Sequence, residues 1–125
     1  MSNVAVLGCT LQPVSPATGV ITITPNQQSQ EVFINNKGVY FDRINFTVSG
    51  SNGGGSIGDN NGTGSGHIVA TGRNLQEVPS GKFVVLEGDT ATLVVNGTSD
   101  EGDEPASGTI TVKVTNAGQT DVSLT

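Results

Sequence analysis

Short runs in which apolar and polar residues alternate are the feature that most limits how this chain can fold. Residues 21–24, 43–48 and 109–114 each alternate with a period of two residues, and most of their apolar members are β-branched. Such a pattern predicts strands with one buried face. Apolar stripes with the 3.6-residue period of a helix do not extend beyond about two turns. The sequence therefore predicts an all-β fold.

A turn signal separates two further apolar runs. Residues 31–34 lead into Asn35 and Asn36, which are followed by Lys37 and the apolar residues 39–41. Asn adopts positive φ more readily than most residues, so this segment predicts a β-hairpin. Further short strands are expected over 82–86 and 92–95, bounded by turns at Gly81, at Gly88 with Asp89, and at residues 96–97.

Glycine is concentrated in one segment. Residues 49–66 contain eight of the 18 glycines of the chain, together with Ser, Asn and Asp. A segment with so little apolar surface is not expected to offset the entropy lost on ordering. We therefore predict a long flexible loop over residues 49–65, and a second, acidic loop over residues 99–104.

The chain also repeats itself. Gly19, Gly66 and Gly108 each open a Gly-x-Ile segment that continues into β-type residues. The first two segments proceed alike, through a turn with Lys37 or Lys82 to an apolar run that ends near an Asp. We interpret residues 1–125 as one pseudo-threefold domain of three related units, at 19–48, 66–97 and 108–125. The simpler alternative is a chance recurrence of Gly-x-Ile in a glycine-rich β protein.

The composition excludes several classes of protein. Five Lys and Arg against eleven Asp and Glu give a formal net charge of −6. Proteins that bind nucleic acid normally carry a basic surface, so we expect no nucleic-acid partner. The chain has no run of about 18 apolar residues that would span a membrane. Its first residues lack the basic and apolar regions of a secretory signal, so we expect synthesis in the cytoplasm.

The apolar core must be thin, because the chain has four Phe, one Tyr and no Trp. A small core built from Val, Ile and Leu is often completed by the surface of a partner. We therefore expect a module that docks onto another protein.

In its repeated β segments the chain resembles the PAAR-repeat and PAAR-like proteins, which cap the central spike of contractile injection machines. Residues 32–37, Val-Phe-Ile-Asn-Asn-Lys, resemble the first element of that family, and residues 66–72 followed by 81–89 resemble the second. The resemblance covers residues 4–97 and, more loosely, the C-terminal unit. It implies a small cone of β-hairpins with pseudo-threefold repeats.

The resemblance also implies a function. Such a cone caps and sharpens a trimeric β-helical spike in a phage tail, a type VI secretion system or a related injection particle. It can carry effector proteins, and it meets the target membrane only transiently. The positions implied to matter are structural and turn residues: Gly19, Asn35, Asn36, Lys37, Gly66, Gly81, Lys82, Gly88, Asp89 and Gly108.

The chain departs from the family in two respects. The literal Pro-Ala-Ala-Arg motif is absent, and residues 83–86, Phe-Val-Val-Leu, stand in its place. Family members often hold zinc near the tip with His and Cys ligands, and a structural zinc site takes four ligands. Here Cys9 and His67 are the only His and Cys side chains. They are weak candidates, and two ligands are too few for zinc unless carboxylates or other chains contribute, so we assign no metal and no other cofactor.

Patterns typical of an enzyme are missing. Cys9 and His67 are formally a nucleophile and a base, but no spacing supports a catalytic pair. Residues 53–58 lack the Gly-Lys-Ser/Thr ending of a phosphate-binding loop. We expect no catalysis, and the leading hypothesis is a structural spike-tip protein. The alternative is a β-sandwich decoration or adhesion module on a phage capsid or fibre, which fits the alternating strands equally well.

Overall fold

The structure, a computed structural model, describes residues 2–77, 82–98 and 104–124. Strands dominate it, and the prediction of an all-β fold is confirmed. The elements are β1 (Ser2–Asn3), β2 (Thr10–Pro13), β3 (Val20–Ile23), β4 (Phe33–Ile34), β5 (Lys37–Gly38), β6 (Arg43–Ser51), the 3-10 turn η1 (Gly53–Gly55), β7 (Gly62–Val69), β8 (Gly72–Glu77), β9 (Lys82–Val84), β10 (Thr90–Thr98), β11 (Pro105–Asn116) and β12 (Ser123–Leu124). A helix long and apolar enough to cross a membrane does not occur among the described residues.

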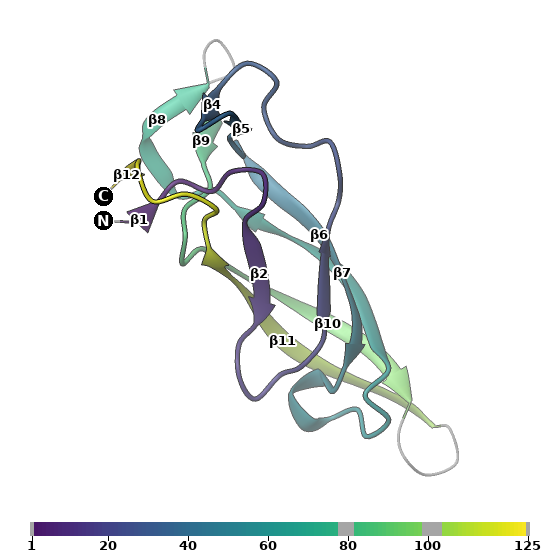
Figure 1. Cartoon of the computed structure of the whole chain (residues 1–125). Helices are drawn as coiled ribbons and strands as arrows, with labels where there is room; N and C mark the ends of the chain where they lie inside the picture. Colours follow the sequence, from purple (N-terminus) through teal and green to yellow (C-terminus); the bar gives the residue numbers. More distant parts are fainter. Residues whose placement is uncertain (1, 78–81, 99–103, 125) are drawn as a thin grey trace.

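Six strands form one antiparallel sheet in the order β2-β11-β10-β7-β6-β3 (Figure 1). The sheet curls into a nearly closed barrel. Its two edge strands, β2 and β3, complete the circle without pairing with each other.

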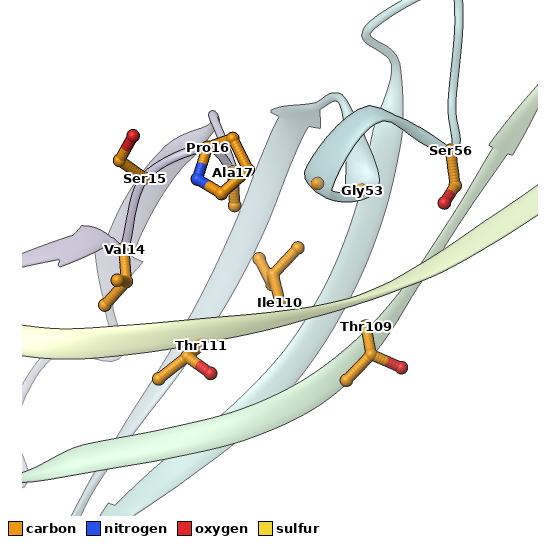
Figure 2. A pocket seen from close by; sticks show the side chains of 10 residues that line it. Val14, Ser15, Pro16, Ala17, Gly53, Ser56, Thr109, Ile110 and Thr111 are labelled. Atoms are coloured by element: carbon orange, nitrogen blue, oxygen red, sulfur yellow. The ribbon is translucent and has the colours of Figure 1, made fainter.

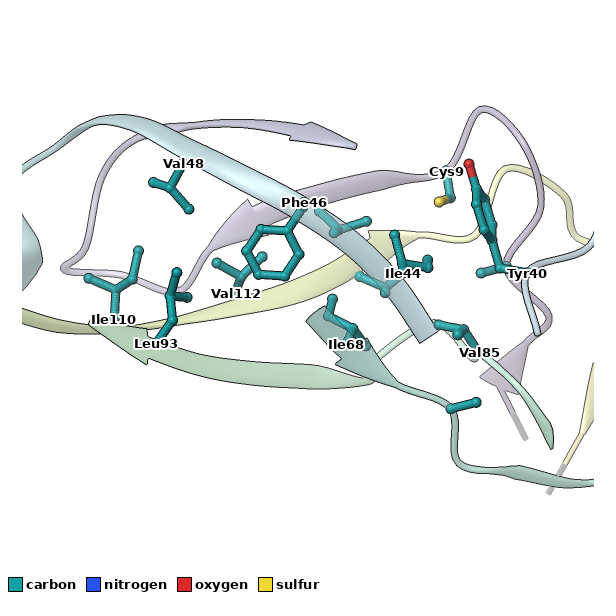
Figure 3. Packing of buried hydrophobic residues seen from close by; sticks show 14 of the residues in the cluster. Cys9, Tyr40, Ile44, Phe46, Val48, Ile68, Val85, Leu93, Ile110 and Val112 are labelled. Atoms are coloured by element: carbon teal, nitrogen blue, oxygen red, sulfur yellow. The ribbon is translucent and has the colours of Figure 1, made fainter. Parts of the chain in front are cut away.

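The interior of the barrel is filled as the alternating pattern predicts. On β6, Ile44, Phe46 and Val48 are buried, whereas Asn45 and Thr47 between them are exposed. Figure 3 shows these side chains pointing toward residues of β7, β10 and β11. Burial of such Val, Ile and Phe side chains contributes about 1.5–3 kcal/mol each before entropy is counted.

Three two-stranded ribbons lie at one end of the barrel: β4–β5, β8–β9, and β1–β12, which joins the two ends of the chain. The predicted hairpin is β4–β5, with Phe33 opposite Gly38 and Ile34 opposite Lys37. Asn35 and Asn36 have φ of 54° and 64°, as the two-residue turn of a hairpin requires. Figure 1 shows both chain ends at this end of the molecule.

The connectivity repeats three times. A barrel strand leads into a ribbon and returns as the next barrel strand, in the orders β3-β4-β5-β6, β7-β8-β9-β10 and β11-β12-β1-β2. The three Gly-x-Ile segments lie at the equivalent strands β3, β7 and β11. The third set is completed by N-terminal residues, so the two ends of the chain together supply one repeat.

The structure corrects the glycine-rich loop predicted over residues 49–65. β6 continues to Ser51 and β7 begins at Gly62, so only about half of that segment is loop. Ile57 is 1% exposed and belongs to the barrel core. One buried Ile gives the segment the apolar contact that its average composition lacks. Of the predicted acidic loop, residues 99–103 lie outside the described residues.

Candidate docking site

Three extended segments meet at the end of the barrel that carries the ribbons. They are residues 4–6, 39–41 and 84–86, and each directly follows or overlaps the second strand of a ribbon. Antiparallel bridges connect Val4 with Leu86, Val6 with Val39, and Phe41 with Val84. Each segment therefore pairs with both others, and we call the assembly the threefold ring.

Backbone hydrogen bonds close the threefold ring. The Tyr40 N–H donates to the Ala5 carbonyl at 3.1 Å, the Ala5 N–H donates to Val85 at 2.8 Å, and the Val85 N–H donates to Tyr40 at 3.0 Å. The three residues occupy the same place in their segments. A cyclic set of this kind satisfies buried backbone groups without a continuous strand ladder.

A second set of hydrogen bonds surrounds the first. The N–H of the residue after each segment donates to the carbonyl of the residue before the next segment. The pairs are Leu7 to Gly38 at 2.9 Å, Asp42 to Phe83 at 2.8 Å, and Glu87 to Asn3 at 2.8 Å. The pseudo-threefold relation therefore extends over at least five consecutive residues of each segment.

Side chains of the threefold ring divide between two cores. The central residues Ala5, Tyr40 and Val85 belong to the barrel core. The flanking residues form a second cluster, made up of Val4, Val6, Val39, Phe41, Val84 and Leu86. Val32, Ile34 and Val122 pack against this second cluster. The threefold ring is thus packed with apolar side chains on both of its faces.

The Gln119 side chain hydrogen-bonds both to the C-terminal segment and to Val4 of the threefold ring. Its side-chain Nε2 donates to the carbonyls of Val4 and Val122, both at 2.8 Å. Its Oε1 accepts from the N–H groups of Asp121 at 2.7 Å and Val122 at 2.9 Å. This buried side chain joins the C-terminal segment to Val4, at one corner of the threefold ring.

The first ribbon also contacts the C-terminal segment. The Asn35 Nδ2 donates to the Asp121 carboxylate at 2.7 Å, and the Lys37 Nζ donates to the Gly118 carbonyl at 3.1 Å. Asn35, Asn36 and Lys37, predicted as structural positions, therefore lie at the ring end of the molecule.

Gly88 and Asp89, which the sequence predicts as a turn, form the turn between the threefold ring and β10. Gly88 has a φ of 97°, a conformation that favours glycine. The Asp89 carboxylate accepts from the Leu86 N–H at 2.8 Å and from the Thr71 hydroxyl. The turn therefore fixes the direction in which one ring segment enters the barrel.

The remaining predicted positions lie along the barrel or its ribbons, except for one that is not among the described residues. Gly19 precedes β3 with a φ of 146°, and a Cβ there would lie 3.1 Å from Val48 Cγ1. Gly66 lies opposite Phe46 in the β6–β7 ladder. Gly108 lies on β11 against Gly53.

Lys82 begins β9 in the position equivalent to that of Lys37 in β5. Gly81 lies outside the described residues.

The two candidate metal ligands do not share a site. Cys9 is buried in the barrel core, whereas His67 is exposed on β7 opposite Asn45. The part of the chain that the structure describes contains no group of three or more His, Cys, Asp or Glu side chains suited to a metal ion. Burial raises the pKa of the Cys9 thiol to about 11, so this sulfur is protonated near neutral pH.

Local sequence pattern does not predict the threefold ring. The signal that could have found it is a recurring Val followed by two further apolar residues: Val4-Ala5-Val6, Val39-Tyr40-Phe41 and Val84-Val85-Leu86. Each run is too short to stand out among the many Val residues of a β protein. Comparisons of this chain with family models, with curated proteins and with solved structures found no match.

Proposed function

We propose that this protein is a structural spike-tip protein, which caps the trimeric central spike of a contractile phage tail or related injection machine. The observation that carries the proposal is the closed set of hydrogen bonds among Ala5, Tyr40 and Val85. A single chain matches a threefold partner when three of its segments present similar backbone in a threefold arrangement. The role is mechanical and uses no catalytic group.

The shape of the molecule suggests how it would sit on such a spike. The three ribbons form one end, whereas the β10–β11 hairpin extends farthest toward the opposite end (Figure 1). We assign the ribbon end to the spike and the hairpin end to the target. Phe33, on the first ribbon, is 54% exposed and supplies an apolar contact at the ribbon end.

The alternative function, a decoration or adhesion module, implies a β-sandwich with two facing sheets. The described strands instead place six members in one sheet that curls on itself. This arrangement favours the spike-tip proposal, because the described strands are not arranged as the two facing sheets that the alternative assumes.

Binding to the spike tests the proposal. The purified chain is mixed with the trimeric spike protein of its own injection system, and the mass of the complex is measured by light scattering. We expect one copy of this chain for three spike chains. A three-to-three complex, or the absence of any complex, would contradict the proposal.

A matched pair of variants tests which end binds. Phe33→Asp places a charge at the ribbon end, and we expect it to weaken spike binding by about tenfold or more. Val94→Asp is the control, since Val94 is 55% exposed on β10, along the side of the barrel. Equal losses in both variants would contradict the assignment of the ribbon end.

A further inference from the structure

A hollow of about 430 Å³ opens to solvent beside the threefold ring, and we call it the tyrosine hollow. Residues 7–9, which lead from the ring into β2, form one wall. Residues 23–26, at the end of β3, form the other wall together with Gln28, and Tyr40 of the ring completes the lining. Protein pockets that hold small molecules have volumes of about 300–1,000 Å³, so the hollow has room for one.

The hydroxyl group of Tyr40 faces this hollow without a protein partner. Tyr40 is 2% exposed, yet its hydroxyl forms no hydrogen bond with the described part of the chain. Within that part no fully buried side-chain oxygen or nitrogen lacks a partner, so the Tyr40 oxygen is not sealed in the core. Figure 3 shows it pointing away from Ile44 and Val85, on the side of Cys9. The hydroxyl is therefore a donor that a molecule in the hollow can use.

The threefold ring itself does not require this hydroxyl. Tyr40, Ala5 and Val85 occupy equivalent places in the ring, and the bonds between them use only backbone groups. Both equivalents are apolar, and Tyr40 is the only tyrosine of the chain. Phenylalanine would fill the same core space, and a mostly buried hydroxyl without a partner lowers stability relative to it. Packing in the ring therefore does not account for the hydroxyl.

The turn beside the hollow differs from its equivalent in the second repeat. Cys9 follows Gly8 as Asp89 follows Gly88, and both glycines have a φ of 97°. The Asp89 carboxylate accepts from the Leu86 N–H at 2.8 Å. Cys9 brings a smaller, uncharged side chain to the same place in its repeat, and it lines the hollow. The tyrosine hollow thus has no carboxylate where the related turn has one.

The whole lining of the tyrosine hollow is uncharged. Residues 1–30 include no Asp, Glu, Lys, Arg or His, so neither wall carries a charge. Burial and the neighbouring Cys9 raise the pKa of Tyr40 to about 12, so the hydroxyl stays protonated near neutral pH. Surroundings that disfavour the tyrosinate also disfavour an anionic ligand, and the lining has no carboxylate to pair with a cation. The hollow therefore suits an uncharged molecule.

A second hollow, of about 360 Å³, lacks these features. It lies near the opposite end of the barrel, between residues 14–17, η1 and β11 (Figure 2). Its hydroxyl groups on Ser15, Ser56 and Thr109 belong to exposed residues, which water reaches directly. The second hollow serves as a control for the first.

We infer that the tyrosine hollow binds a small, uncharged, mostly apolar molecule, whose oxygen accepts a hydrogen bond from the Tyr40 hydroxyl. The apolar part of the molecule lies against Leu7, Ile23 and Pro25 of the two walls. The oxygen is that of a carbonyl or an ether, because the protonated hydroxyl donates. This inference does not rest on the spike-tip function, since it uses only the lining of the hollow.

Three related compounds test the inference on the full chain. Acetophenone carries a carbonyl oxygen on an apolar frame, ethylbenzene has nearly the same frame without an acceptor, and benzoate adds a negative charge. Each is titrated into the protein, and chemical shifts are followed by NMR. The Ile23 methyl groups report on the tyrosine hollow, and the Val14 methyl groups report on the second hollow.

We expect acetophenone to shift the Ile23 methyl signals in a saturable way, with half-saturation at about 1–10 mM, as for a ligand of this size. The Val14 signals should stay in place, and benzoate should shift neither. Tyr40→Phe should weaken acetophenone binding by about three- to tenfold, which is the effect of one hydrogen bond. The response of Ile23 to ethylbenzene should be the same in both proteins.

A second pair of variants keeps the test independent of Tyr40. Leu7→Asp places a charge at the mouth of the tyrosine hollow, where Leu7 is 47% exposed, and should weaken acetophenone binding by about threefold or more. Val14→Asp is the matched control, since Val14 is 41% exposed and lines the second hollow. It should leave the binding of acetophenone unchanged.

Four results would overturn the inference. They are the absence of saturable shifts with acetophenone, equal shifts at Ile23 and Val14, unchanged acetophenone binding in the Tyr40→Phe variant, and equal effects of Leu7→Asp and Val14→Asp. Shifts of the Tyr40 ring signals that depend on the concentration of the protein alone would identify a second copy of this chain as the occupant. That result would also overturn the inference.

Discussion

The backbone of Gly53 lies directly against Gly108, so that a Cβ atom on residue 108 would overlap the Gly53 carbonyl group. Gly53 belongs to η1 and Gly108 to β11, so this contact brings the glycine-rich segment onto the barrel wall. Ile57 extends from the same segment into the core, where Gly62 and Gly97 leave room for it. The glycines thus serve close packing at the end of the barrel opposite the threefold ring.

Replacing Gly108 by Ala should therefore destabilise the fold. The added methyl group forces η1 away from β11, and overpacking of this kind costs about 1–3 kcal/mol. The free energy of unfolding, measured by urea titration, is expected to fall by that amount. Ser107→Ala is the control, since Ser107 is exposed on the same strand. An unchanged stability of the Gly108→Ala variant would mean that the two backbones do not touch.

Truncation of Ile57 tests whether the glycine-rich segment is anchored by its one large apolar side chain. Ile57→Ala leaves a cavity in the core, and such truncations cost about 2–5 kcal/mol. Val94→Ala, on the exposed face of β10, is expected to cost less than about 0.5 kcal/mol. Urea titration of both variants measures the difference. Similar small losses in both would show that Ile57 lies in solvent.

Much of the fold could be predicted from local pattern. Alternation located the strands, Asn35 and Asn36 marked the hairpin, and Gly19, Gly66 and Gly108 marked equivalent barrel strands. These signals are local, because the period of two and the positive φ belong to neighbouring residues.

Other parts of the fold depend on contacts that no local pattern records. Ile57 is a single apolar residue among glycines, so it produces no periodicity, and its burial is visible only in the folded barrel. Gln119 reaches Val4 of the threefold ring, which lies 115 residues away in sequence. Cys9 and His67 are each the only residue of their type, which makes them a pair in the sequence, yet in the structure one faces the core and the other faces outward.

Gln119 provides a test of how the C-terminal segment is held against the threefold ring. Gln119→Ala leaves the carbonyl of Val4 without its partner, and a buried group left unsatisfied costs about 1–3 kcal/mol; the variant also loses the part-buried bonds to the N–H groups of Asp121 and Val122. We expect the unfolding free energy to fall by about 2–4 kcal/mol, from the loss of these bonds. Amide exchange at residues 4–6 should accelerate more than exchange in β10.

The control for this variant is Gln12→Ala, since Gln12 is exposed on β2. It should leave both stability and exchange near their original values. Acceleration that is uniform over the whole barrel in the Gln119→Ala variant would show that this side chain has no specific role in the ring.

Stability should decrease at alkaline pH because of Cys9. Burial raises the pKa of its thiol to about 11, while the unfolded chain has an ordinary thiol that ionises near pH 8.5–9. Between these values the unfolded chain binds fewer protons than the folded one, so the unfolding free energy falls as pH rises. A difference of two pKa units corresponds to about 2–3 kcal/mol, a loss that begins near pH 9 and is complete near pH 11.

Urea titrations at intervals between pH 7 and pH 10.5 measure this loss, and Cys9→Ala is the comparison. The variant lacks the thiol but keeps Tyr40, whose pKa is raised to about 12 by burial and by the neighbouring Cys9. Its unfolding free energy should therefore fall less steeply above pH 9 than that of the natural chain. Parallel curves for the two proteins would mean that Cys9 ionises as readily in the folded chain as in the unfolded one.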